Sequence, residues 1–275
     1  MKKEDYDFLA NLVEKRNGWE FFPEYFYVLD KKVSAFVREN GYINVDALMV
    51  DIRAGNKLLI ERLSEELAYN DTSFFRDYDV FKRFSELVLP NIKEKYSAAK
   101  KLSVWSCGCS TGQEVYSVLI ALKKTGFLGE WSVNLIGTDF SSKAVSFASK
   151  GFYSYYDVQN GNNIRTIVDN FNQTETGWVI KPEIAQYVEF RKYNLLEIPL
   201  FNNKFDIVFC RNTIKYFTME NQSKIIENIH STQPAGGLFY SGLNEKIHGL
   251  EEFYEKVSGF ECLYQAKSLN NKKAR

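Results

Sequence analysis

The chain has 275 residues, of which 45% are hydrophobic, enough for a large α/β domain together with a smaller helical one. Lys and Arg total 35 and Asp and Glu also total 35, so no net charge directs the protein toward nucleic acid or an anionic membrane. No apolar run approaches the roughly 18 residues of a membrane span, and the first residues, MKKEDYDFLA, lack the apolar core of a signal peptide. We therefore expect a cytoplasmic protein that binds no nucleic acid and inserts into no membrane.

The N-terminal third of the chain predicts helices. Between residues 3 and 92, apolar residues recur three and four positions apart, which is the spacing of amphipathic helices. Turn-forming residues supply the breaks between these helices: Pro23, Gly41, Asn44 and Gly55. Pro90 and the polar run after it indicate a connecting helix or linker. We expect a helical domain over residues 1–85 and a linker over residues 86–101.

From Leu102 the pattern changes to short apolar runs that alternate with amphipathic stretches. The predicted strands are LSVWS, SVNLIGT, FDIVFCRN and GGLFYSG, and the predicted helices cover residues 114–123, 142–149 and 221–230. This alternation predicts a doubly wound, mostly parallel sheet with helices on both faces. We place this α/β domain over residues 102–275.

Two further stretches predict additional β-structure. GWVIKPEIAQYVEF, residues 177–190, alternates in the manner of a hairpin, which a simple doubly wound domain does not need. We interpret it as part of a small antiparallel insertion over about residues 162–190. GFECLYQAK, residues 259–267, is expected to form an edge strand.

Candidate ligand-binding residues follow the first two strands of the predicted sheet. Ligands of such sheets bind beyond the carboxyl ends of the strands. After the first strand, Gly108 and Gly112 allow backbone to approach a ligand, and Ser110 and Thr111 can cap the next helix. The second strand ends at Asp139, an acid placed to accept hydrogen bonds from ribose hydroxyls. Together these residues predict an adenosyl pocket.

Each of these features also has a purely structural interpretation. A glycine-rich turn is often only a site of tight packing, and Asp139 is equally able to cap the helix that begins near Ser141. The spacing from Gly108 to Gly112 is not the G-x-G-x-x-G of a dinucleotide site, which ranks a nicotinamide dehydrogenase last.

The four cysteines are too few and too scattered for a disulfide framework: Cys107, Cys109, Cys210 and Cys262. No matching Cys or His pair accompanies them, so no metal site is expected. The alternative to purely structural cysteines is a reactive one: Cys107 and Cys109 lie between a strand and the start of a helix, where a thiolate can be stabilised. Such a thiolate lacks a visible base or resolving partner.

Several segments resemble, in order, the signature segments of CheR-type chemoreceptor methyltransferases: VWSCGCSTGQEVYSVLIAL, LIGTDFSSKAVSFASKGFYS, YNLLE, FDIVFCRNTIKYF and PAGGLFYSG. Upstream, YNDTSFFRDYDVFKRF is similar to the N-x-T-x-F-F-R segment of that family, and the match extends from about Tyr25 to Glu245. The resemblance implies an S-adenosylmethionine-dependent enzyme that esterifies glutamate side chains of bacterial chemoreceptors and releases S-adenosylhomocysteine.

Carried over position by position, the resemblance implies a set of cofactor-binding residues: Asn70, Thr72, Arg76, Glu114, Asp139, Asn194, Leu195, Asn212 and Thr213. In it Glu114 meets the methionyl amino group and Asp139 the ribose. The implied catalytic residues are Arg76, which orients the substrate carboxylate, and Tyr216, which stands at the reacting methyl. No general base is needed, because a glutamate is already ionised at neutral pH.

Structural alternatives remain open for several of these residues. Asn70 and Thr72 are also good helix caps, and Tyr216 is also an ordinary half-buried aromatic. Arg76 is able to pair with Asp77 or Asp79 on a solvated face.

The partners implied by the resemblance are the cytoplasmic helices of methyl-accepting receptors. We expect the enzyme itself to be a monomer. A possible basic docking face lies on the N-terminal helices: Lys31, Lys32, Arg38, Arg53, Lys57 and Arg62. A solvated mixed-charge surface is equally consistent, because acidic residues interleave with the basic ones. The insertion around Trp178 to Phe190 resembles the β-subdomain that adds a receptor peptide as an extra strand in some relatives.

Three departures from the family pattern concern substrate choice more than cofactor binding. Lys215 precedes Tyr216 where relatives usually carry an apolar residue, and Asp71 and Ser73 vary the linker segment. LNEKIHGL replaces a stretch that usually contains small residues and a histidine. A methyltransferase of the same fold with another protein or a small molecule as acceptor, or a non-catalytic receptor-binding module, therefore stays as an alternative.

Overall fold

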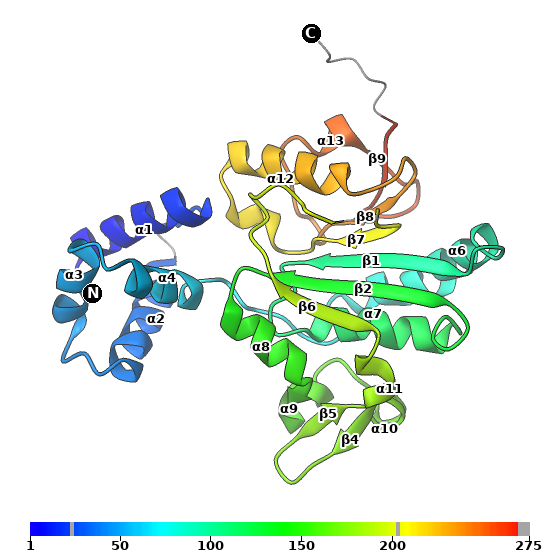
Figure 1. Cartoon of the computed structure of the whole chain (residues 1–275), viewed down its shortest axis with the longest axis horizontal. Helices are drawn as coiled ribbons and strands as arrows, with labels where there is room; N and C mark the ends of the chain where they lie inside the picture. The colour runs from blue at the N-terminus through cyan, green and yellow to red at the C-terminus, as the bar shows by residue number, and fades with distance from the viewer. Residues whose placement is uncertain (23–24, 202–203, 269–275) are drawn as a thin grey trace.

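The computed structural model describes residues 1–22, 25–201 and 204–268, so the break expected at Pro23 lies outside the described residues. The first four helices form a bundle beside the rest of the protein (Figure 1): α1 (Lys3–Asn17), α2 (Phe26–Glu39), α3 (Val45–Arg53) and α4 (Lys57–Glu66). Asn44 and Asn56 begin α3 and α4, where their side chains accept hydrogen bonds from Ala47 N at 2.9 Å and Leu59 N at 3.2 Å. The expected breaks near Asn44 and Gly55 are therefore helix boundaries.

One helical stretch connects the bundle to the sheet. It consists of α5 (Tyr78–Arg83), the π-helical turn η2 (Phe84–Val88) and α6 (Leu89–Lys95). Pro90 has no N–H for the helical ladder, and the π-helical turn lies immediately before it. Phe81 and Phe84 of this stretch are buried in the same core cluster as the sheet residue Phe209. The domain boundary at residue 85 and the linker over 86–101 stay predictions.

The main sheet has seven strands in the order β6-β2-β1-β7-β8-β10-β9. The strands are β1 (Lys101–Cys107), β2 (Ser132–Asp139), β6 (Val188–Lys192), β7 (Ile207–Phe209), β8 (Leu238–Tyr240), β9 (Tyr254–Lys256) and β10 (Leu263–Ala266). The first five in spatial order pair in parallel, and β10 pairs antiparallel with β8 and β9. This arrangement confirms the predicted doubly wound, mostly parallel fold.

Helices cover both faces of this sheet because its strands are apolar on both sides. Leu102 and Val104 of β1 face one core cluster, which α7 (Gln113–Lys124) and η2 complete. Trp105 and Cys107 face the other cluster, which contains α12 (Met219–Ser231) and continues into the N-terminal bundle. The period of two along β1 thus assigns alternate side chains to two different cores. The helices α8 (Ser142–Lys150), η3 (Ile214–Tyr216) and α13 (Leu250–Phe253) also belong to this domain.

The prediction of an edge strand at residues 259–267 was wrong. β10 lies between β8 and β9, so its backbone is paired on both sides. The edge strand on this side of the sheet is β9, a short segment whose Glu255 and Lys256 are exposed. Charged residues protect an edge from pairing with other chains, but they also hide the apolar signal by which a strand is found.

A small antiparallel sheet lies below the main one in Figure 1, in the order β3-β5-β4. It consists of β3 (Phe152–Tyr153), β4 (Phe171–Gln173) and β5 (Trp178–Ile180), with α9 (Tyr155–Gln159) and α10 (Ile164–Asn170) between the strands. The prediction of a hairpin within residues 177–190 was correct for the first strand, β5, which lies in the small antiparallel sheet, and wrong for the second. Pro182 ends the extended segment and begins α11 (Pro182–Ala185), and β6 after it joins the main sheet.

Within the described ranges, the chain has no helix of the length and apolarity that a membrane crossing requires.

Candidate active site

An open pocket lies where the carboxyl ends of the central strands meet the N-terminal bundle. It has an empty volume of about 540 Å³, a figure that includes the part open to solvent. Six of the predicted site residues line it: Asp139, Asn194, Leu195, Asn212, Thr213 and Tyr216. The other lining residues come from the bundle and from loops of the sheet domain: Trp19, Ala68, Tyr69, Gly108, Phe140, Tyr193 and Phe217. The pocket is therefore shared between two parts of the chain.

The turn after β1 makes a close contact with the loop after β7. Gly108 has a φ of +65°, and a Cβ at this position would lie 2.5 Å from Oγ1 of Thr213. Only glycine allows both this conformation and this approach. The glycine predicted for a close ligand approach thus also brings two walls of the pocket together.

The expected capping of α7 by Ser110 or Thr111 was wrong. The helix begins after Gly112, whose φ is +95°, and no side chain caps it. Ser110 instead donates its hydroxyl proton to the carbonyl oxygen of Asn70 at 3.2 Å. This hydrogen bond ties the segment that leaves the bundle to the turn after β1.

Asp139 is fixed at the end of β2 by backbone hydrogen bonds. Its Oδ2 accepts from Ser110 N at 2.8 Å and its Oδ1 accepts from Ser141 N at 2.9 Å. The helix α8 is capped by Ser141, whose hydroxyl accepts from Ala144 N, so Asp139 is not the cap. Burial raises the pKa of the Asp139 carboxyl, although these N–H groups oppose the shift. Each oxygen keeps a lone pair for a hydroxyl group of a ligand.

Asn212 presents an unsatisfied acceptor in the pocket wall. Its backbone has a φ of +56°, and its Oδ1 is buried with no hydrogen-bond partner among the described residues. Buried polar atoms are rarely left without a partner, so an unpaired oxygen in a pocket is suited to an N–H group of a ligand. Asp139 and Asn212 both line the pocket, and these two hydrogen-bond acceptors fit the hydroxyl and N–H groups of an adenosyl group.

Tyr216 stacks on an aromatic side chain of the bundle. Its ring lies 4.1 Å from that of Tyr69, with an angle of 8° between the planes. Burial raises the pKa of the Tyr216 hydroxyl, so this group stays protonated at neutral pH. The ammonium group of Lys215, the departure noted in the sequence, lies 5.1 Å from the centre of the Tyr216 ring.

Asn70, Thr72 and Arg76 do not line the pocket. Asn70 is exposed and Thr72 half-buried, and neither caps a helix in the described part of the chain, because α5 begins after Asp77. The Arg76 guanidinium pairs with Asp71 rather than with Asp77 or Asp79: Nη1 donates to the Asp71 carbonyl at 2.8 Å, and Nη2 lies 3.4 Å from the carboxylate. This partly exposed pair leaves the arginine able to exchange partners.

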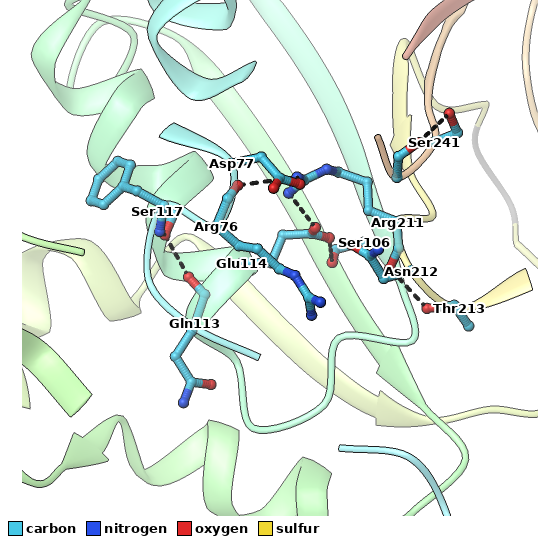
Figure 2. Close-up of polar contacts among 12 residues, drawn as sticks. Arg76, Asp77, Ser106, Gln113, Glu114, Ser117, Arg211, Asn212, Thr213 and Ser241 are labelled. Carbon is cyan, nitrogen blue, oxygen red and sulfur yellow. Dashed lines mark hydrogen bonds and ion pairs between the residues drawn. The ribbon is translucent and has the colours of Figure 1, made fainter. Parts of the chain in front are cut away.

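Glu114 does not line the pocket either, and it belongs to a charged network whose central residue, Arg211, was missed in the sequence. Oε1 of Glu114 accepts from Ser106 Oγ at 2.9 Å, and its Oε2 accepts from Nη1 of Arg211 at 3.2 Å. Figure 2 shows the Arg211 guanidinium between Glu114 and Asp77, with Nη2 2.7 Å from Asp77 Oδ2. Burial raises the pKa of the Glu114 carboxyl, and the charge of Arg211 opposes this shift. Arg211 lies within FDIVFCRN, directly before Asn212, but nothing local marks it as a site residue.

Glu245 is a second residue that sequence reasoning missed. Its carboxylate accepts from three backbone N–H groups: Asn212 at 2.9 Å, Lys215 at 3.0 Å and Gly242 at 2.8 Å. It therefore holds the loop that carries Asn212 and Tyr216. Its position in LNEKIHGL, a stretch noted only as a departure, was the available signal.

The cysteines have no reactive role in this geometry. All four are buried, and burial raises the pKa of the Cys107 and Cys109 thiols well above the ordinary value. The alternative of a stabilised thiolate at the start of α7 was therefore wrong.

Comparisons with known proteins show the family to which the chain belongs. A family described as "CheR methyltransferase, SAM binding domain" matches residues 70–262. The chain is 30% identical over 273 residues to Chemotaxis protein methyltransferase 1 of Pseudomonas aeruginosa, which covers 96% of this chain and 98% of that protein. It is 29% identical over 273 residues to Chemotaxis protein methyltransferase Cher2 of Pseudomonas putida, with the same coverage.

Among solved structures, SAM-bound CalS10, an amino pentose methyltransferase from Micromonospora echinaspora, aligns with 63% of this chain and 58% of its own. The sequence identity is 12% and the TM-score 0.35, values too low to support an inference. The family match covers most of the chain and contains every predicted site residue. The chain belongs to the CheR methyltransferase family, and residues 70–262 contain its S-adenosylmethionine-binding domain.

Proposed function

We propose that this protein transfers the methyl group of S-adenosylmethionine to glutamate side-chain carboxylates of bacterial chemoreceptors, in the adaptation step of chemotaxis. The observation that carries the proposal is the match to chemotaxis methyltransferases along nearly the whole chain. The pocket supports it, because a residue with a buried carboxylate, Asp139, and a residue with an unpaired amide oxygen, Asn212, both line it.

The cofactor residues follow from the donors and acceptors present. Asp139 accepts hydrogen bonds from the ribose hydroxyls, and Asn212 accepts from an N–H group of the cofactor through its unpaired Oδ1. Glu114 pairs with the methionyl ammonium group. Asn194, Leu195 and Thr213 complete the pocket wall, and Asn70 and Thr72 approach it from the segment that leaves the bundle.

The reaction requires the protein to position the substrate carboxylate and the cofactor methyl group, and it requires no proton transfer. The cofactor, when bound, supplies an electrophilic methyl group on a sulfonium, and the glutamate nucleophile is ionised at neutral pH. Arg76 holds the substrate carboxylate in a fixed plane, exchanging its contact with Asp71 for one with the substrate. The Tyr216 ring faces the sulfonium region, where an aromatic face attracts a cation, and the docked receptor would cover the open side of the pocket and exclude water.

The receptor would dock on the N-terminal bundle. Three of the expected basic residues are already engaged there: Lys32 with carbonyl groups at the end of α4, Arg53 with Asp5 at 2.9 Å, and Arg62 with Asn40 at 2.5 Å. The exposed cations that remain for acidic receptor helices are Lys31, Arg38 and Lys57. A tethering receptor peptide would add to an outer strand of the small sheet, β3 or β4, and the enzyme would act as a monomer in the cytoplasm.

The test is methyl transfer from labelled S-adenosylmethionine into receptor-containing membranes, together with calorimetric titration by S-adenosylhomocysteine. We expect micromolar binding and base-labile label for the wild-type protein, and neither for Asp139→Ala, which removes the acceptor of the ribose hydroxyls. Label that is stable to base, or found only in other acceptors, would support a different methyltransferase. Binding without transfer would support a receptor-binding module, and no binding would exclude the enzyme.

A further inference from the structure

Arg211 is a buried cation to which the proposed reaction gives no role. Only 1% of its side chain is exposed, although it lies next to Asn212 at the floor of the pocket. A charged group is taken out of water at high cost unless it is paired, so its partners indicate what it does.

The guanidinium of Arg211 joins two segments that are far apart in the chain. Nη1 donates to Oε2 of Glu114, in the first turn of α7, at 3.2 Å. Nη2 donates to the carboxylate of Asp77 at 2.7 Å and to the carbonyl oxygen of Arg76 at 3.0 Å. The guanidinium carbon also lies 5.4 Å from the centre of the Phe81 ring. One planar group therefore links Glu114 to the segment that contains Arg76 and Asp77 (Figure 2).

Burial raises the pKa of the Glu114 carboxyl, and the charge of Arg211 is the main influence that opposes this shift, with the charge of Arg76 acting in the same direction. The Glu114 side chain is 13% exposed, and its other partner, Ser106, is neutral. Desolvation favours the uncharged acid, and a protonated glutamate cannot pair with an ammonium group. Arginine stays charged at every physiological pH, so it favours the ionised form of the adjacent carboxylate.

We propose that Arg211 is a positioning residue for methyl transfer: it holds Glu114 as an oriented carboxylate for the methionyl ammonium group, and it fastens the Arg76–Asp77 segment that orients the substrate. This inference rests on the proposed function, because it requires an S-adenosyl cofactor at Glu114. Neither contribution requires Arg211 to touch cofactor or substrate.

The experiment compares Arg211→Met with the wild-type protein and uses two ligands from about pH 5.5 to about pH 8.5. S-adenosylhomocysteine carries the amino acid end, whereas 5′-methylthioadenosine keeps the adenosine and lacks that end. We expect Arg211→Met to weaken S-adenosylhomocysteine about tenfold near pH 7, with affinity recovering as pH rises because Glu114 then ionises. Affinity for methylthioadenosine should stay within about twofold of the wild type, since it does not use Glu114.

Arg211→Lys tests the second contact with the charge retained. A lysine ammonium lacks the fork that reaches both segments, so we expect a wild-type pH profile for S-adenosylhomocysteine and a KM for the receptor raised about threefold or more. This variant also decides the question if the methionine variant does not fold.

Three results would overturn the inference. The first is an Arg211→Met protein that binds S-adenosylhomocysteine with the wild-type pH profile. The second is an equal loss of both ligands at every pH, which would indicate a general structural role. The third is an Arg211→Lys protein with an unchanged receptor KM. Failure of the proposed function is distinguishable, because the wild-type protein itself would then not bind S-adenosylhomocysteine.

Discussion

Tyr216 is a residue whose position depends on a partner from another part of the chain. It ends the short helix η3, and its ring stacks on Tyr69, which lies shortly after the end of α4 in the chain. Stacked aromatic pairs contribute about 0.5–1.5 kcal/mol beyond the area they bury. The ring, rather than the hydroxyl, is therefore the part that the surrounding structure fixes.

Tyr216→Phe keeps this ring, and Tyr216→Ala removes it. We expect the phenylalanine variant to keep kcat and affinity for S-adenosylhomocysteine within about threefold, and the alanine variant to lose about tenfold or more in kcat/KM. Steady-state methyl transfer to receptor membranes provides the measurement. Tyr156→Phe, at a side chain that is 75% exposed, is the matched control. A phenylalanine variant as impaired as the alanine one would assign the function to the hydroxyl instead.

At the scale of elements, the loop from Asn212 to Tyr216 is held by a residue of another loop. Glu245 follows β8, and its two oxygens accept the backbone N–H groups of Asn212 and Lys215 as well as that of Gly242. A carboxylate is suited to this position because it only accepts hydrogen bonds and has room for several. The left-handed backbone of Asn212, with a φ of +56°, is kept in place by one of these bonds.

Glu245→Ala leaves these three N–H groups without their acceptor. We expect the free energy of unfolding to fall by about 2 kcal/mol, because unsatisfied buried donors cost about 1–3 kcal/mol each and water reaches some of them. Affinity for S-adenosylhomocysteine should fall as well, since Asn212 loses its fixed position. Chemical denaturation and calorimetry measure the two effects. Glu252→Ala, at an exposed glutamate nearby, should change neither. A stable variant with normal affinity would refute the role of Glu245.

At the scale of the whole molecule, ion pairs fasten the N-terminal bundle against the sheet domain. Lys192 at the end of β6 lies 2.5 Å from Glu65 and 3.2 Å from Glu61 of α4. Glu65 also accepts from the backbone N–H of Ser142 at the start of α8, at 3.0 Å. Because Trp19 and Tyr69 of the bundle region line the pocket, this interface contributes to the shape of the pocket.

Lys192→Glu places a negative charge beside Glu61 and Glu65. We expect severalfold weaker binding of S-adenosylhomocysteine and a loss of at most about 1 kcal/mol in unfolding free energy, because these side chains are partly exposed to water. Both effects should shrink as salt rises from about 0.05 M to about 0.5 M. Lys256→Glu on the edge strand β9 makes the same charge change away from the interface. Equal behaviour of the two variants would mean that the ion pairs do not hold the bundle.

The sequence determined the class of fold and the position of Asp139, because both depend on local signals. Alternating apolar runs and amphipathic stretches predicted β1, β2, β7 and β8 with their helices, and Asp139 was marked by its place at the end of β2, whereas the resemblance implied Asn212. Resemblance to a family added the segment around Arg76, which no periodicity marks. Whether these residues act as expected stays a prediction.

Only the tertiary structure decided which distant residues meet. Arg211 is 97 positions from Glu114 and 134 from Asp77, and no short motif encodes such a network. The pairing of β6 with β2, and of β10 between β8 and β9, likewise depends on how the chain crosses over. The tertiary structure also decided the position of Lys32, which was expected on a docking face. Its ammonium group donates to carbonyl groups at the end of α4, and burial lowers its pKa. Local sequence sets which segments are strands or helices, whereas charge pairing and strand order are settled only when the chain closes on itself.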